Sequence, residues 1–197
     1  ELQLFDSLTG SQVIQLATAP GGEPGLLFYE SFDSVAAIVE SGEARVQGLS
    51  DADDTVMGRF ANALHVQNNG DSADLLSWPA AGKLDSARGE ISFWYRPDFG
   101  PEENNPQTFF ETTDRGAGAG MRIYRCQGCS NWPNEFRIRL RNNYHTATKL
   151  EPQVAMSWQA NEWHHIRVSW DLTAGDAADR YIAYAIDGTV ADIKTGI

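Results

Sequence analysis

The sequence predicts an all-β fold in which two antiparallel sheets pack as a sandwich. Short runs rich in apolar and β-branched residues recur along the chain, and Gly, Asn, Asp and Pro separate them, as expected for strands joined by turns. No segment has the pattern of a long amphipathic helix. A chain of 197 residues that is 42% hydrophobic can bury one sizeable core, so a single sandwich is the expected architecture.

The predicted strands begin at residue 26 and continue to residue 186. Alternation is strict in the segment from Phe136 to Arg141, where one face is apolar and the other is a row of arginines. Many strands without helices between them indicate antiparallel pairing. We predict strands at Leu26–Tyr29, Ala63–Gln67, Glu90–Arg96, Thr108–Thr112, Met121–Tyr124, Glu135–Arg141, Trp163–Trp170 and Tyr181–Ile186.

Residues 1–25 have a different pattern from the rest of the chain. Apolar residues from Leu2 to Leu16 are followed by a cluster of breakers, Pro20 to Gly25. This pattern predicts an N-terminal extension with a Pro/Gly hinge, followed by one domain from residue 26 to 197. The alternative is one more ordinary strand of the same domain.

Five segments between residues 28 and 188 carry a family resemblance. They are Tyr29–Ser34, Gly58–Leu64, Ile91–Pro97, Glu162–Asp171 and Tyr184–Gly188. In this order they resemble the laminin G-like jelly roll of the concanavalin A-like lectin and glucanase superfamily, especially its bacterial members. Ala61 departs from the pattern, because the family has Gly there. The resemblance implies a jelly-roll sandwich but no single activity, since this fold carries lectins, adhesins, lyases and glucanases.

A second departure concerns the end of the domain. The family usually has a further strand after the Asp-Gly hairpin, which closes the sandwich beside the first strand, whereas only nine residues follow Gly188. A missing strand would leave backbone groups and apolar core uncovered. We therefore expect residues 1–20 to supply β-pairing, either within the chain or, preferably, in a neighbouring copy as an exchanged strand.

Net charge, hydropathy and motif spacing argue against several functions. The formal net charge of -12 repels phosphate backbones, so no nucleic-acid partner is expected. No run of 18 apolar residues exists, so no membrane insertion is expected. Glu111 and Asp114 have the wrong spacing to share one strand face as a glucanase carboxylate pair, and Tyr144 with His145 forms only an isolated candidate for a lyase base. We predict that the protein is not an enzyme.

The two cysteines, Cys126 and Cys129, lie three apart in a polar, turn-like stretch. A disulfide that closes a small loop at a hairpin tip is the favoured interpretation. Two free thiols and a partial metal site are the alternatives. The disulfide agrees with an oxidising setting, so we expect an extracellular or cell-surface location.

Arginines form the most informative cluster of polar residues. Six arginines lie between residues 115 and 141 against a single acid, Glu135. In the strand interpretation, one face carries exposed arginines that could hold carboxylates or sulfates of an acidic glycan, while aromatic rings stack on sugars. The alternative is a solvated surface paired with the protein's own acids. The predicted ligand-binding residues are Arg122, Tyr124, Arg137, Arg139, Arg141, Trp132 and Tyr144.

Acidic residues in predicted loops suggest a structural calcium ion, because Ca²⁺ prefers carboxylate and carbonyl oxygens. The family resemblance implies a calcium near the first strand, which makes Asp33 the candidate ligand. His164 and His165 are adjacent in a strand, point to opposite faces, and are expected to be structural.

The predicted function is a non-catalytic extracellular recognition module that binds an acidic glycan or surface polymer. The alternative is a structural subunit of an extracellular assembly or filament, a homo-oligomer in which a terminal β-strand is exchanged between copies.

Overall fold

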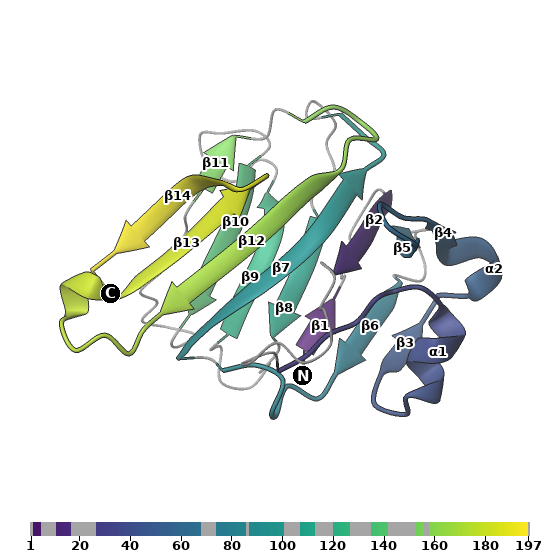
Figure 1. Cartoon of the computed structure of the whole chain (residues 1–197), viewed down its shortest axis with the longest axis horizontal. Helices are drawn as coiled ribbons and strands as arrows, with labels where there is room; N and C mark the ends of the chain where they lie inside the picture. The colour runs from purple at the N-terminus through teal and green to yellow at the C-terminus, as the bar shows by residue number, and fades with distance from the viewer. Residues whose placement is uncertain are drawn as a thin grey trace.

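Two antiparallel sheets lie face to face in the computed structural model (Figure 1). The structure describes residues 2–4, 11–16, 27–67, 74–85, 87–100, 107–112, 120–126, 135–141, 153–155 and 158–196. Within these residues each sheet has seven strands. The prediction of an all-β, two-sheet antiparallel sandwich is confirmed.

The first sheet, sheet A, has the strand order β11-β10-β9-β8-β1-β6-β3. Its strands are β1 (Leu2–Leu4), β3 (Arg45–Gln47), β6 (Leu75–Trp78), β8 (Gln107–Thr112), β9 (Gly120–Cys126), β10 (Glu135–Arg141) and β11 (Gln153–Ala155). Sheet B has the order β14-β13-β12-β7-β2-β5-β4. Its strands are β2 (Ser11–Leu16), β4 (Thr55–Met57), β5 (Asn62–Gln67), β7 (Arg88–Pro97), β12 (His164–Asp171), β13 (Tyr181–Ile186) and β14 (Thr189–Thr195).

Alternating strands place the core between the sheets. Phe136 and Ile138 of β10 are fully buried, as are Ile166 and Val168 of β12, because every second side chain of a strand faces the same way. Aromatic rings join the two layers: Phe109 of β8 lies 4.6 Å from the ring of Tyr95 on β7. The apolar alternation in the sequence therefore decides which face of each sheet is inside.

The N-terminal segment contributes one strand to each sheet. β1 pairs with β6 and β8 in sheet A, and β2 pairs with β5 and β7 in sheet B. In Figure 1 these two purple strands lie within the sheets rather than beyond their edges. Both sheets therefore depend on residues 2–4 and 11–16 for continuous pairing.

The predicted strand at Leu26–Tyr29 is wrong for the residues that the structure describes there. Residues 27–34 form no strand, and Phe32 has a φ of 59° with its side chain fully buried. The ring of Phe28 instead packs edge-on against Trp78, 5.2 Å between centroids. Ser34 then caps helix α1 (Val35–Glu40) by accepting a hydrogen bond from the Ala37 amide.

Acidic residues hold the short helices in place. The carboxylate of Asp51, the first residue of α2 (Asp51–Asp54), accepts hydrogen bonds from the amides of Val35 and Ala36 at the start of α1. It also accepts from the hydroxyls of Ser34 and Thr55, at 3.0 and 3.1 Å. Asp51 therefore joins two segments 16 residues apart. A single 3₁₀ turn, η1 (Ala177–Asp179), precedes β13.

Sheet B ends in a hairpin. Asp187 and Gly188 both have positive φ, 51° and 81°, as a two-residue turn of type I′ requires. β14 follows this turn and pairs with β13, with a bulge between Tyr184 and Ala185. Within the described residues no helix is long and apolar enough to span a bilayer.

Candidate ligand-binding face of sheet A

Strand pairing brings four of the predicted site residues together on the outer face of sheet A. Arg139 of β10 lies directly opposite Arg122 of β9, and Arg137 lies opposite Tyr124. On the other side of β9, Glu111 of β8 is opposite Arg122. The face therefore consists of neighbouring rows of polar side chains across three strands.

The two arginines flank the ring of Tyr124. The guanidinium carbon of Arg122 lies 5.0 Å from the ring centroid and that of Arg139 lies 5.1 Å from it. Arg139 donates a hydrogen bond from Nη2 to the Tyr124 hydroxyl, at 2.7 Å. Arg122 donates from Nε to Thr108 Oγ1, at 3.0 Å, and also from Nη2. Both guanidinium groups are therefore fixed in orientation.

Arg137 does not have the exposure that the sequence predicted. Its side chain is only 5% exposed, and its Nε and Nη2 contact Oε2 of Glu135 at 2.6 and 2.5 Å. Burial alone would lower the pKa of Arg137, but the hydrogen bond and charge of Glu135 outweigh it and raise the pKa above its ordinary value. Glu135 lies two residues earlier on the same strand face, and this pairing is what allows the guanidinium to be buried.

The prediction that Tyr124 stacks on a sugar ring is also wrong. Its side chain is 5% exposed, and the guanidinium groups of Arg122 and Arg139 lie against the ring. The side chain of Arg141, although its backbone is opposite Gly120, lies outside the described residues, as do Trp132 and Tyr144. The described part of the predicted site is thus an arginine pair supported by a tyrosine.

Arg125 belongs to the interior and not to the outer face. It is fully buried, with its guanidinium carbon 4.5 Å from the ring centroid of Phe99. It lies near Tyr95, whose pKa is raised well above its ordinary value by burial, although the charge of Arg125 lowers it in part. The alternation of Met121, Ile123 and Arg125 on one face of β9 could have predicted this position.

Acidic side chains lie beside the arginines on this face. Oε2 of Glu135 is bonded to Arg137, and Glu111 of β8 lies opposite Arg122. Glu111 approaches Arg122 only to 3.9 Å. Arg122 and Arg139 thus bring two guanidinium groups from neighbouring strands to one face of the sheet.

The calcium prediction at Asp33 is not supported by a ligand cluster. Oδ1 of Asp33 accepts a hydrogen bond from the Asn62 amide at 3.0 Å, and its carbonyl accepts one from the Asn62 side chain at 3.1 Å. Among the described residues, no three His, Cys, Asp or Glu side chains gather as a metal site would require. Asp33 therefore has a visible role in tying the first segment to β5, and calcium binding stays a prediction.

The cysteine prediction concerns the connection between β9 and β10. Cys126 ends β9, and its backbone is opposite Glu135 at the start of β10, so it lies at one end of a hairpin. Cys129 and the side chain of Cys126 lie outside the described residues. The disulfide therefore stays a prediction.

The adjacent histidines point to opposite faces, as predicted. His164 stacks on Trp158, with 4.5 Å between ring centroids, and its Nδ1 lies 2.8 Å from Asp187. His165 lies on the outer face of sheet B, where its Nε2 is 2.7 Å from the Ser92 hydroxyl. These separate partners confirm that the two rings do not act on one ligand.

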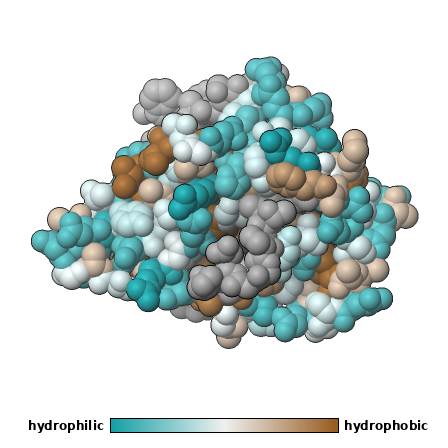
Figure 2. Space-filling view, viewed as in Figure 1, coloured by the Kyte–Doolittle hydropathy of each residue, from teal (hydrophilic) through white to brown (hydrophobic). Residues whose placement is uncertain are grey.

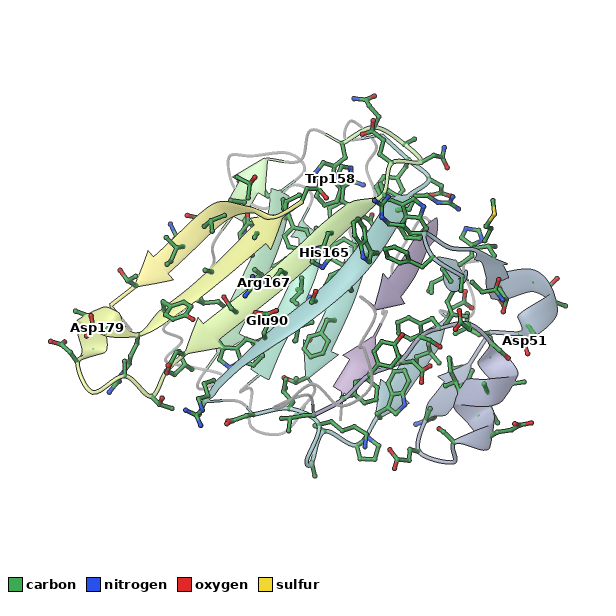
Figure 3. All side chains as sticks on the ribbon, in the orientation of Figure 1. Asp51, Glu90, Trp158, His165, Arg167 and Asp179 are labelled. Carbon is green, nitrogen blue, oxygen red and sulfur yellow. The ribbon has the colours of Figure 1, made fainter. Side chains whose placement is uncertain are left out.

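A second polar and aromatic cluster on sheet B was missed by the sequence analysis. The guanidinium carbon of Arg59 lies 4.1 Å from the Trp94 ring centroid, and the rings of Phe60 and His165 lie 5.9 and 4.9 Å from Trp94. Nearby, Arg167 pairs with Glu90 at 2.6 Å (Figure 3). All of these residues except Glu90 belong to segments that carry the family resemblance, where they were considered as evidence for the fold or, for His165, as structural.

No protein-family model, curated protein or solved structure matches this chain. The resemblance to the laminin G-like family therefore stays a prediction from short motifs.

Proposed function

We propose that the protein is a non-catalytic extracellular recognition module that binds an acidic glycan or surface polymer through Arg122 and Arg139. The observation that carries this proposal is the position of the two arginines directly opposite each other on β9 and β10. Arg122 is 34% exposed and Arg139 is partly exposed, so both can reach a ligand. A carboxylate or sulfate beside them would accept hydrogen bonds from their guanidinium groups.

Guanidinium groups suit this ligand chemistry. Each presents N–H donors in a planar fork that matches the oxygens of a carboxylate or sulfate. Tyr124 and Thr108 already hold the two side chains, so less conformational entropy is lost when a ligand binds. The buried pair of Arg137 and Glu135 lies in the same sheet face and gives the site a rigid base.

Net charge determines how such a ligand would be recognised. The chain as a whole has a formal net charge of -12, which repels an acidic polymer at long range. Binding therefore depends on short-range contacts at the arginine pair and is expected to be modest in affinity. Added salt screens both the repulsion and the contact, so affinity should be compared at a stated ionic strength.

The test is binding of the wild type and of the double variant Arg122→Gln/Arg139→Gln to an array of acidic and neutral glycans. We expect the wild type to bind acidic members and the variant to lose at least about tenfold in affinity, because even one charge-assisted contact is worth about 1.5–3 kcal/mol. Arg167→Gln is the control for the loss of one positive charge, because Arg167 is exposed on sheet B.

Two results would count against this function. One is equal binding of acidic glycans by the wild type and the double variant when both have the same melting temperature. The other is a complete lack of glycan binding by the wild type. Loss of binding in Arg167→Gln to the same extent would show a general charge effect and would also remove the assignment.

A second candidate function is a structural subunit of an extracellular assembly, joined by exchange of the N-terminal strands. The observation that favours it is that β1 and β2 occupy interior positions in both sheets, where a neighbour's strands could make the same pairings. Deleting residues 1–22 should then unfold the domain or give a monomer that the corresponding peptide rescues. A deleted protein with unchanged melting temperature and solution mass would exclude this candidate.

A further inference from the structure

β14 forms an open edge of sheet B that carries exposed apolar side chains. It is the last strand of the sheet within the described residues, and it pairs with β13 on one side. Val190 and Ile193 are 66% and 51% exposed. Figure 2 shows a strongly hydrophobic area at the left of the view, where Figure 1 places β14. Edge strands of this kind readily pair with another strand.

The backbone of Ile193 faces this open edge. The amide of Gly196 donates to the carbonyl of Arg180 at 3.1 Å, so this residue pair is hydrogen-bonded across β13 and β14. Hydrogen-bonded and non-hydrogen-bonded pairs alternate in an antiparallel ladder, which directs the polar groups of Ile193 and Thr195 outward. The Ile193 amide accordingly donates to the carboxylate of Asp192, at 2.9 Å.

The charges beside Ile193 are complementary to a second copy of themselves. Asp192 and Lys194 flank Ile193, and within the chain their charged atoms are 3.7 Å apart. In an antiparallel pairing centred on Ile193, Asp192 of each copy lies opposite Lys194 of the other. A pairing centred on Lys194 would instead place two lysines directly opposite each other, which is unfavourable.

We propose that β14 pairs antiparallel with β14 of a second copy of this chain, with the two Ile193 residues opposite each other. The two B sheets then form one continuous sheet across a twofold axis. The paired Ile193 residues exchange backbone hydrogen bonds, and their side chains lose exposure to water. Lysines and bulges usually protect edge strands, but here Asp192 of the second copy neutralises the lysine. The inference goes beyond the proposed function and does not depend on glycan binding.

The experiment measures solution mass across a protein concentration series for the wild type, Asp192→Lys, Lys194→Asp and the double variant Asp192→Lys/Lys194→Asp. We expect the wild type to be a dimer at high concentration. Each single variant places like charges opposite each other twice and should raise the dimer dissociation constant by at least about tenfold. The double variant restores opposite charges and should return close to the wild-type value. Glu40→Lys, on α1, is the control for a change in net charge.

Melting temperatures of all variants show whether β14 is still folded. A wild type that stays monomeric at the highest soluble concentration would overturn the proposal. So would single variants that dimerise as well as the wild type, or a double variant that stays as impaired as the single ones. Polymers larger than a dimer that disappear when residues 1–22 are deleted would indicate strand exchange instead.

Discussion

Arg137 and Glu135 form a buried ion pair on the outer face of sheet A, with Nη2 of Arg137 2.5 Å from Oε2 of Glu135. Both residues are almost inaccessible to solvent, although they lie on the face of β10 that points away from the core. The Arg137 guanidinium can be buried there because the Glu135 carboxylate supplies the opposite charge. The pair therefore supports the sheet, whereas Arg122 and Arg139 on the same face are partly exposed.

Replacing Glu135 by Gln should lower the free energy of unfolding by about 3 kcal/mol, because it leaves a buried guanidinium without its counter-charge. Urea denaturation followed by tryptophan fluorescence measures the change. The double variant Glu135→Gln/Arg137→Met removes both charges and should recover part of the loss. A loss below about 1 kcal/mol in Glu135→Gln would show that the pair contributes little.

The stability of the protein should fall as pH drops below the ordinary pKa of histidine, partly because of His165. Burial lowers the pKa of His165 from 6.5, the charge of Arg167 lowers it further, and the charges of Asp187 and Glu90 oppose this. The unfolded chain thus takes up the proton at a higher pH than the folded protein, and the stabilising contribution is present above pH 6.5 and lost below it.

Urea midpoints measured from about pH 8 to pH 5 test the role of His165. His165→Gln should flatten this profile relative to the wild type. Arg167→Gln should flatten it in part, because it removes one cause of the lowered pKa. Identical profiles for the wild type and His165→Gln would contradict the assignment.

Position 89 requires glycine, because the ring of Trp170 occupies the space that a Cβ atom would need. A Cβ at position 89 would be 2.8 Å from Cζ2 of Trp170, which is 1% exposed and donates through Nε1 to the Asp85 carbonyl. Gly89→Ala should destabilise the fold by about 1–3 kcal/mol through overpacking. Gly175→Ala is the control, because the space around Gly175 is open. Equal unfolding midpoints for the two variants would refute this explanation.

The predicted disulfide between Cys126 and Cys129 has a direct chemical test. Titration of the denatured, unreduced protein should find no reactive thiols, and two should appear after reduction. Two thiols per chain before reduction would exclude the disulfide. Cys126 at the end of β9 makes the hairpin connection the segment that such a bond would constrain.

Local alternation predicted much of the fold. It placed Phe136 and Ile138 in the core, and it grouped Arg122, Tyr124, Arg137 and Arg139 on one face. Alternation gives the side on which a residue lies but not how deeply it is covered, so the burial of Arg137 was missed. The nearby Glu135, two residues away on the same face, was the signal that could have indicated an internal ion pair.

Contacts between segments that are distant in the sequence explain the other predictions that were wrong or missed. The apolar run Leu26–Tyr29 had the composition of a strand, but Phe28 packs on Trp78 and the chain turns at Phe32 with a positive φ. The start of α1 is capped by Asp51, 16 residues further along the chain, which no local pattern could predict. Sequence spacing alone does not determine such partners.

The most direct test of the central claim compares one polysaccharide in two charge states. Calorimetric titration with oligogalacturonate and with its methyl-esterified form varies the carboxylates while the sugar stays the same. We expect the wild type to bind only the acidic form at the same ionic strength, and Arg122→Gln/Arg139→Gln to lose that binding. Equal binding of both forms, or undiminished binding by the double variant, would contradict recognition of an acidic polymer by the arginine pair.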